Sequence, residues 1–377
     1  MSLTRRAFCG SLAIGGLLAA APAGAGVPVR VTDMTGRTVS LPTLPKRIIL
    51  LEARDIVSMA LLHPDPGSVV VGWAATARID SGLLREQYEK GHRIQVVGKL
   101  SPDTVSIEGL AALSPDLVVA TSYMTPSGSS DLLLRTLDNL GIPVIFSDTS
   151  SNFPDSKAAG SGPITDMHNQ MRMWGEVLGV PEKAHAFTEF FDSHLEAVSS
   201  CVAGVPPITT YLEVQSTIDD CCWAAGNDVW GKLLERAGGR NLPAVTAPWY
   251  QQLQLEYLLS TPHEVYIASG GGWASGNRPA IGPGLDPTAG RKGLERLTER
   301  TGFGQLSSVR HKRVHGIWTG LIAVPAFNIL FIEIVARWLH PGPCASIDPD
   351  ATLTEINERF LQKPLDGPLW ISIEEHQ

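Results

Sequence analysis

Aromatic and arginine side chains gather in predicted loops and at predicted strand ends. These residues are Arg54, Trp73, Arg78, Tyr123, Trp223, Trp249, Tyr250, Trp273, Arg278 and Trp318. Aromatic faces supply large contact areas, and guanidinium groups supply forked donors to carboxylate or catecholate oxygens. Such a set suits a bulky ligand that is flat or chelated and partly anionic. The alternatives are internal packing or rim contacts for each tryptophan, and solvated surface charges for the arginines.

Motifs for metal binding and for nucleophilic catalysis do not occur in the chain. It has no C-x-x-C pair, its ten histidines are scattered without metal-ligand spacing, and no G-x-S-x-G elbow is found. A segment that resembles a nucleotide-binding loop, 226–233, ends in Leu233 where Ser or Thr must hold magnesium. We therefore expect no resident metal or cofactor and no catalytic residues.

Four cysteines remain after the N-terminal region: Cys201, Cys221, Cys222 and Cys344. An oxidising compartment permits disulfides, but four cysteines allow three connectivities, and the sequence does not choose between them. The neighbouring pair at 221 and 222 has two open interpretations. It is either a vicinal disulfide or two buried thiols.

The first 25 residues are typical of a twin-arginine export signal. Arg5 and Arg6 precede an apolar run over 12–21 that is too short to span a bilayer, and small residues end at Ala25. We therefore predict a soluble protein of the periplasm. Cys9 lies before the apolar run, so we expect no lipid anchor. The alternative is a buried N-terminal helix.

Composition indicates a globular chain of about two domains. It has 377 residues, of which 44% are hydrophobic and 18% charged, and a formal net charge of −8. No basic block occurs, so non-specific nucleic-acid binding is excluded as a function.

Strand and helix signals alternate along the chain, which predicts an α/β protein with parallel sheets covered on both faces. Strands are expected at 47–51, 69–72, 117–120, 143–146, 208–214, 264–268 and 314–318, with helices between them. A 22-residue amphipathic helix over 181–202 separates two such series. We therefore predict an N-terminal α/β lobe over 26–180, a bridging helix over 181–204 and a C-terminal α/β lobe with a tail over 205–377.

Several motifs resemble the periplasmic binding proteins that serve importers of iron-siderophores, haem and cobalamin. They include the opening Val-Thr-Asp-Met-Thr-Gly-Arg at 31–37, Leu-Ser-Pro-Asp-Leu-Val at 113–118 and Leu-Glu-Arg-Ala-Gly-Gly-Arg-Asn at 234–241. The resemblance implies two Rossmann-like lobes, a ligand cleft between them and a stiff bridging helix. It also implies that Glu108 and Glu256, one on each lobe, dock onto arginines of a membrane permease. The alternative for each glutamate is a charge that the helix dipole favours at an N-terminus.

Together these features predict a monomeric solute-binding protein that delivers a ferric siderophore to an inner-membrane ABC importer. Haem remains open because Tyr123 or Tyr250 could serve as its axial ligand. Cobalamin also remains open, because cobalamin binders of the family use tryptophan-rich clefts. The alternative from another class is a two-lobed periplasmic enzyme acting on a siderophore, which would need a nucleophile–base pair or a redox centre.

Overall fold

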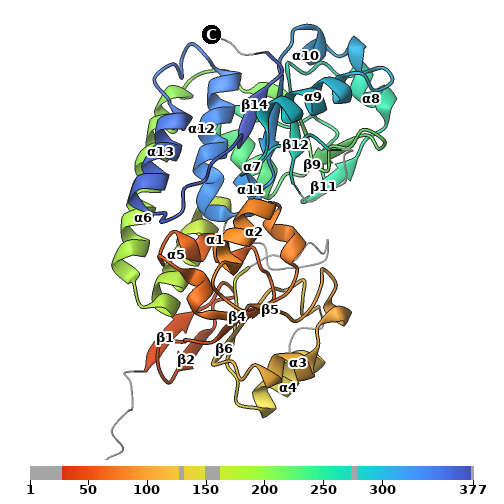
Figure 1. Cartoon of the computed structure of the whole chain (residues 1–377). Helices are drawn as coiled ribbons and strands as arrows, with labels where there is room; N and C mark the ends of the chain where they lie inside the picture. The colour runs from red at the N-terminus through yellow and green to blue at the C-terminus, as the bar shows by residue number, and fades with distance from the viewer. Residues whose placement is uncertain (1–27, 127–130, 149–161, 273–277, 375–377) are drawn as a thin grey trace, which may run out of the picture.

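The computed structural model describes residues 28–126, 131–148, 162–272 and 278–374. The predicted signal peptide and Trp273 lie outside the described residues. Two α/β lobes, each built on its own sheet, stand one above the other in Figure 1. The predicted fold class is thereby confirmed.

The N-terminal lobe is built on a five-stranded parallel sheet in the order β5-β4-β3-β6-β7. Its strands are β3 (Ile48–Leu50), β4 (Val70–Trp73), β5 (Gln95–Val96), β6 (Leu117–Ala120) and β7 (Val144–Phe146). A small antiparallel hairpin, β1 (Val29–Thr32) and β2 (Thr38–Leu41), stands beside this sheet.

Helices cover both faces of this sheet, which explains why its central strands are apolar at every position. Along β6, Leu117 and Val119 face one hydrophobic cluster, whereas Val118 and Ala120 face the other. The first cluster includes residues of α1 (Asp55–Ala60), α2 (Gly82–Glu89) and α5 (Pro163–Leu178). The second includes residues of α3 (Ile107–Ala112) and α4 (Leu132–Asn139).

The C-terminal lobe has a mixed sheet, with the path β11-β9-β8-β12-β13-β14 and β10 paired to β8. Its strands are β8 (Ile208–Glu213), β9 (Trp223–Ala225), β10 (Gly239–Arg240), β11 (Tyr250–Gln252), β12 (Val265–Gly270), β13 (Val314–Trp318) and β14 (Trp370–Ser372). The central strands β8, β12 and β13 are parallel, as predicted. The strands β9, β11 and β14 pair antiparallel at the two edges.

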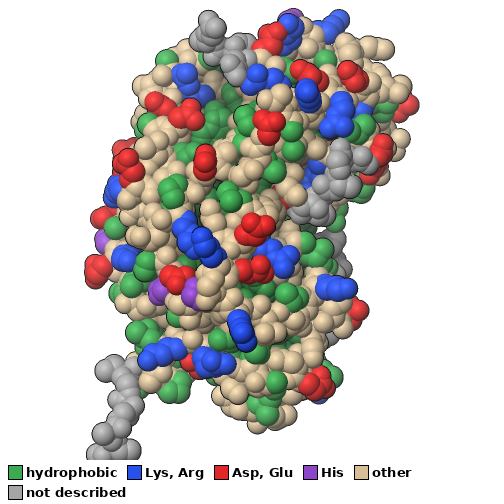
Figure 2. All heavy atoms as spheres, in the orientation of Figure 1, with side chains coloured by type: hydrophobic (Ala, Val, Ile, Leu, Met, Phe, Trp, Pro, Cys, Tyr) green, Lys and Arg blue, Asp and Glu red, His purple; other side chains and the backbone are tan. Residues whose placement is uncertain are grey.

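The helices of this lobe are α7 (Val229–Arg236), α8 (Leu255–Ser260), α9 (Pro287–Thr298), α10 (Ser307–Arg310), α11 (Gly320–Ala323), α12 (Asn328–Leu339) and α13 (Pro349–Arg359). None of the helices in the described part of the chain is long and apolar enough to cross a membrane. Figure 2 shows acidic and basic side chains mixed over one face of the molecule, without a large block of either sign.

One long helix, α6 (Pro181–Cys201), runs along the molecule from the N-terminal to the C-terminal lobe (Figure 1). Its 21 residues correspond to about 32 Å. Ala184, Phe187, Phe191 and Val198 are buried at the spacing of an amphipathic helix, because α6 packs against α5 and α12. The two lobes are therefore joined by a continuous rod, and not only by a flexible linker.

Both cysteine pairs are disulfide-bonded. Cys201, at the end of α6, is linked to Cys344, which follows α12, with 5.1 Å between their Cα atoms. This bond fastens the bridging helix to the C-terminal lobe. Cys221 and Cys222 form the second disulfide, in the loop between β8 and β9.

Candidate functional site

A cavity of about 560 Å³ lies between the two lobes and is lined by both. Most of its walls come from segments that follow strands of the two parallel sheets, where ligands bind in open α/β folds. In the N-terminal lobe these segments follow β3, β4, β6 and β7, and in the C-terminal lobe they follow β8, β12 and β13. The carboxyl ends of the two sheets therefore meet at one hollow.

Six of the ten residues predicted to bind a ligand line this cavity: Arg54, Arg78, Tyr123, Trp249, Tyr250 and Arg278. Trp223 is not among the lining residues, but its ring meets that of Tyr250 edge-on with 5.7 Å between centroids. Its indole N–H donates to Asp220 Oδ2 over 2.7 Å. Trp223 therefore contacts the aromatic wall of the cavity through Tyr250.

Trp73 and Trp318 lie in the hydrophobic core and do not line the cavity. Each is the last residue of a strand whose sheet is covered on both faces, so the last side chain can turn inward. Trp318 Nε1 donates to the backbone oxygen of Asp80 over 3.2 Å, which ties the C-terminal lobe to the N-terminal lobe. Ser81 Oγ adds a second tie, to the carbonyl of Pro283 over 3.1 Å.

Each arginine of the cavity is held by neighbouring groups. Arg78 Nη1 lies 2.7 Å from Glu52 Oε2, and Arg54 Nη2 lies 3.6 Å from the same oxygen. The guanidinium of Arg78 also stacks over the ring of Tyr123, 4.5 Å from its centroid. On the opposite lobe, Arg278 Nη2 donates to Thr319 Oγ1 over 3.0 Å. Burial lowers the pKa of Arg278, and the charge of Asp80 opposes that effect.

Five carboxyl groups that were not predicted as site residues also line the cavity: Glu52, Asp55, Asp80, Asp148 and Asp166. Asp55 opens α1, and its Oδ2 accepts a hydrogen bond from Ser147 Oγ over 2.5 Å. Burial, reinforced by the nearby charge of Glu52, raises the pKa of Asp55 to about 8.

Asp148 follows β7, and its pKa is also raised, though less than that of Asp55. Its Oδ1 accepts from the backbone N–H of Ser122 over 2.9 Å and from the Ser122 hydroxyl over 3.3 Å. Burial raises the pKa of Asp148 to about 7 despite these hydrogen bonds. Near neutral pH the ionised forms of both Asp55 and Asp148 are therefore disfavoured, that of Asp55 more strongly.

The sequence did contain a signal for these carboxyls. Asp55 is adjacent to Arg54, which was predicted to bind a ligand, and Glu52 lies two residues before Arg54. All three residues follow β3. The expected ligand was partly anionic, so aromatic and arginine side chains were predicted to bind it, and the acids in the same loops were not. Trp230, in the first turn of α7, is a further lining residue that was missed.

Glu108 and Glu256 are exposed, each at the second position of a short helix, α3 or α8. Neither carboxylate forms an ion pair with any residue that the structure describes. Figure 1 shows α3 on one lobe and α8 on the other, both on the side of the molecule away from α6. The helices that carry Glu108 and Glu256 thus both lie on the side of the molecule opposite the bridging helix.

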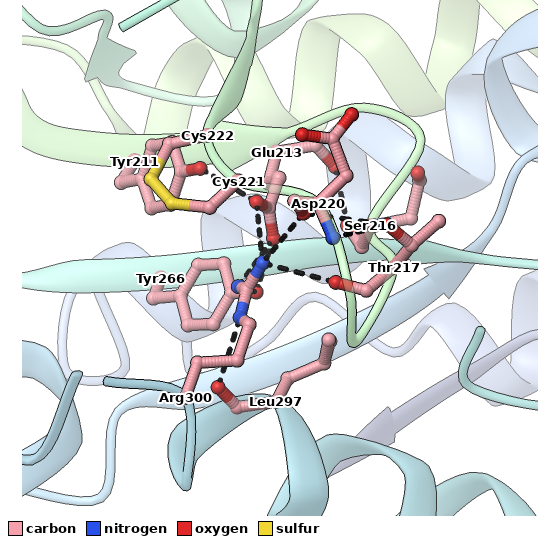
Figure 3. A network of polar contacts seen from close by, with 11 residues as sticks. Tyr211, Glu213, Ser216, Thr217, Asp220, Cys221, Cys222, Tyr266, Leu297 and Arg300 are labelled. Atoms are coloured by element: carbon pink, nitrogen blue, oxygen red, sulfur yellow. Dashed lines mark hydrogen bonds and ion pairs between the residues drawn. A yellow bond between two sulfur atoms is a disulfide. The ribbon is translucent and has the colours of Figure 1, made fainter. Parts of the chain in front are cut away.

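A buried polar network in the C-terminal lobe joins Tyr211, Glu213, Tyr266 and Arg300 (Figure 3). Arg300 Nη1 and Nη2 donate to the two carboxylate oxygens of Glu213 over 3.0 and 2.8 Å. The hydroxyls of Tyr211 and Tyr266 donate to the same carboxylate over 2.8 and 2.5 Å. Burial, followed by the charge of Glu213, raises the pKa of both tyrosines.

This network also fixes the loop that carries the vicinal disulfide. Arg300 Nη1 donates to the carbonyls of Thr217 and Asp220, over 3.2 and 3.3 Å. The loop begins beside Gln215, which lines the cavity, and ends at Trp223. Arg300 and Glu213 therefore hold one wall of the cavity in place.

The two lobes, the bridging helix and the shared cavity define a ligand-binding protein of the two-lobed type. Residues 68–317 match the sequence pattern of the periplasmic binding protein family. The chain belongs to this family, whose members are substrate-binding proteins of transport systems. The predicted family is thereby confirmed.

Curated relatives are distant. An uncharacterized ABC transporter substrate-binding lipoprotein of Bacillus subtilis (YvrC) is 21% identical over 320 residues, which are 83% of this chain and 86% of the relative. The vitamin B12-binding protein of Yersinia pestis is 23% identical over 166 residues, which are 44% of this chain. The match spans 53%, about half, of that relative's length.

Solved structures share the fold. The TroA-like periplasmic binding protein FepB of Veillonella parvula superposes with a TM-score of 0.76 at 22% identity. The superposition covers 92% of this chain and 100% of that one.

Proposed function

We propose that the protein captures a ferric siderophore in the cavity between its lobes and delivers it to an ABC importer. The observation that carries this proposal is the cavity itself, whose volume of about 560 Å³ is in the range of sites for small molecules. Its walls include Tyr123, Trp230, Trp249 and Tyr250, together with three arginines. These side chains suit a large chelate with a flat periphery and several oxygen atoms.

We propose a carrier and not an enzyme. Among the described residues that line the cavity there is no histidine and no cysteine, the usual base and the strongest nucleophile of such sites. A periplasmic enzyme that acts on the siderophore would release a chemically altered product. Incubation of the purified protein with a ferric siderophore, followed by mass spectrometry of the ligand, is expected to return the ligand unchanged.

The experiment that tests the ligand class is purification of the mature protein from the periplasm of its own host under iron limitation. Native mass and a visible spectrum are then recorded on the same sample. We expect a bound mass that contains iron, with a broad charge-transfer band. A protein that emerges empty, and whose tryptophan fluorescence no ferric siderophore quenches, contradicts the proposal.

Cobalamin is the second candidate, because one relative is named a vitamin B12-binding protein. A bound cobalt corrin mass in the same experiment favours it. A sharp Soret band instead indicates haem, with Tyr123 or Tyr250 as the candidate axial ligand. Tyr123 already stacks under Arg78, whereas Tyr250 is 45% exposed, so a Tyr250→Phe variant tests the better-placed ligand first.

Glu108 and Glu256 are proposed to orient the carrier, which acts as a monomer, on a two-fold permease. Charges at the rim of an interface mainly set orientation and association rate. A Glu108→Gln, Glu256→Gln double variant is expected to retain its affinity for the ligand and to lose most uptake in cells. Uptake at the wild-type rate contradicts this role.

Export by the twin-arginine route is proposed from Arg5, Arg6 and the apolar run that follows. Replacing both arginines by lysines is expected to leave the unprocessed chain in the cytoplasm. The Bacillus subtilis relative is named a lipoprotein, whereas Cys9 of this chain precedes the apolar run. We infer that the mature protein is not lipid-anchored, and an added diacylglyceryl mass at its N-terminus contradicts this.

A further inference from the structure

The cavity carries more acidic than basic side chains. The described lining includes Arg54, Arg78 and Arg278, against Glu52, Asp55, Asp80, Asp148 and Asp166. Three positive and five negative groups give a formal charge of −2 when all are ionised. The described lining thus has more acidic than basic side chains, although burial favours the protonated forms of Asp55 and Asp148.

The arginines of the cavity are already compensated within the protein. Glu52 Oε2 is shared between Arg78 at 2.7 Å and Arg54 at 3.6 Å. Arg278, on the other lobe, is attracted by Asp80. An anionic ligand would therefore have to compete with carboxylates that the fold has placed beside each guanidinium.

Asp55 and Asp148 are compensated less directly, through the charge of Arg54. Neither forms an ion pair with a described residue. Asp55 accepts a hydrogen bond from Ser147, and Asp148 accepts two from Ser122. The charges that act on both are Glu52 and Arg54. Burial beside other carboxyls raises the pKa of each, so this wall already retains a proton near neutral pH.

A second observation points to a ligand at the same wall. Glu52 is only 3% exposed and lines the cavity. Its Oε2 is occupied by the arginines, but its Oε1 accepts no hydrogen bond from any described residue. A buried carboxylate oxygen without a donor is costly, and a donor on the ligand would remove that cost.

We propose that Glu52, Asp55 and Asp148, the carboxyl wall, receive an ammonium group or N–H donors of the ligand, and that the ligand has no net negative charge. This inference rests on the proposed function and narrows it. Among ferric siderophores it selects neutral or cationic chelates, such as tris-hydroxamates, and disfavours tris-catecholates, whose ferric complexes carry three negative charges. Like charges placed together are a common way of rejecting the wrong ligand.

The test is a series of ligands that share one chelate and differ only in charge. Ferric desferrioxamine B has a free ammonium group and a net charge of about +1, its N-acetyl derivative about 0 and its N-succinyl derivative about −1 at pH 8. Dissociation constants are measured by quenching of tryptophan fluorescence, with a ferric tris-catecholate as a fourth probe. We expect affinity to fall roughly tenfold with each unit of negative charge added.

Variants then assign the preference to the carboxyl wall. In an Asp55→Asn, Asp148→Asn double variant, both hydrogen-bond acceptors remain but neither side chain can ionise. We expect the differences between the three derivatives to shrink to about threefold or less. The control is Asp138→Asn, which neutralises an exposed carboxylate on α4, outside the cavity lining, and is expected to leave the series unchanged.

Each negative result of these titrations excludes a different part of the proposal. Equal or tighter binding of the succinyl derivative or the tris-catecholate overturns the charge preference and leaves a siderophore carrier standing. A preference that persists undiminished in the double variant overturns its assignment to Asp55 and Asp148. If none of the four ferric probes binds, both this inference and the proposed function are wrong.

Discussion

Replacing Asp55 by asparagine is expected to stabilise the protein, and to do so more strongly as pH rises. Asp55 is buried beside Glu52 and Asp148, with Arg54 as the opposing positive charge, so its ionised form is disfavoured in the folded state. Asparagine has nearly the same shape and keeps an oxygen that can accept the hydrogen bond from Ser147. The substitution therefore removes the charge while it preserves the packing.

The magnitude follows from the two pKa values. The carboxyl of Asp55 titrates near 8 in the folded protein, against 3.8 for the ordinary side chain. Below about pH 4 both folded and unfolded chains keep the proton, so wild type and variant differ little. As pH rises toward 8 the unfolded chain releases its proton first, and the wild type loses stability that the variant keeps. At about 1.4 kcal/mol per pKa unit, the difference in free energy of unfolding between the variant and the wild type grows by roughly 4 kcal/mol between about pH 5 and pH 8.5.

The assay is urea denaturation of the full mature chain, without ligand, at a series of pH values between 5 and 8.5. The free energy of unfolding of Asp55→Asn minus that of wild type is plotted against pH. Asp138→Asn, in which an exposed carboxylate is neutralised, is the matched control and should give a flat line near zero. A flat line for Asp55→Asn, or a loss of stability that increases with pH, refutes the reasoning.

Three further predictions concern stability and binding. Removing the Cys201–Cys344 disulfide by double alanine substitution should lower the free energy of unfolding by at most about 5 kcal/mol, because the bond closes a loop with a sequence separation of 143; a loss below about 1 kcal/mol in urea denaturation contradicts this. Arg300→Met should lower the free energy of unfolding by about 3–5 kcal/mol, because it leaves the carboxylate of Glu213 buried without its cation. A thermal midpoint equal to that of the wild type contradicts a stabilising role for the Arg300–Glu213 ion pair. Tyr250→Ala should weaken ligand binding about tenfold by fluorescence titration, with little effect on unfolding, because this half-exposed ring lines the cavity; unchanged affinity removes Tyr250 from the site.

The candidate site could be predicted from the sequence only in part. Position after a strand correctly indicated that Arg54, Arg78 and Tyr123 line the cavity, because the carboxyl ends of parallel strands share one edge. The same rule predicted that Trp73 and Trp318 line the cavity, but both side chains lie in the hydrophobic core. A side chain at the end of a doubly covered strand can turn either way, and neighbouring packing decides between them.

What the sequence by itself determined is the architecture, because it depends on local periodicity. Alternating strand and helix patterns indicated the two α/β lobes, and apolar spacing indicated the helix over 181–202, which the structure has at Pro181–Cys201. Tertiary structure alone decided the pairing of Cys201 with Cys344 and the chemistry of the carboxyl wall. Asp55 meets Ser147 across 92 positions of sequence, and its proton is retained because several segments together exclude water from it. Local patterns are set by neighbours along the chain, whereas charge and proton affinity are set by neighbours in space.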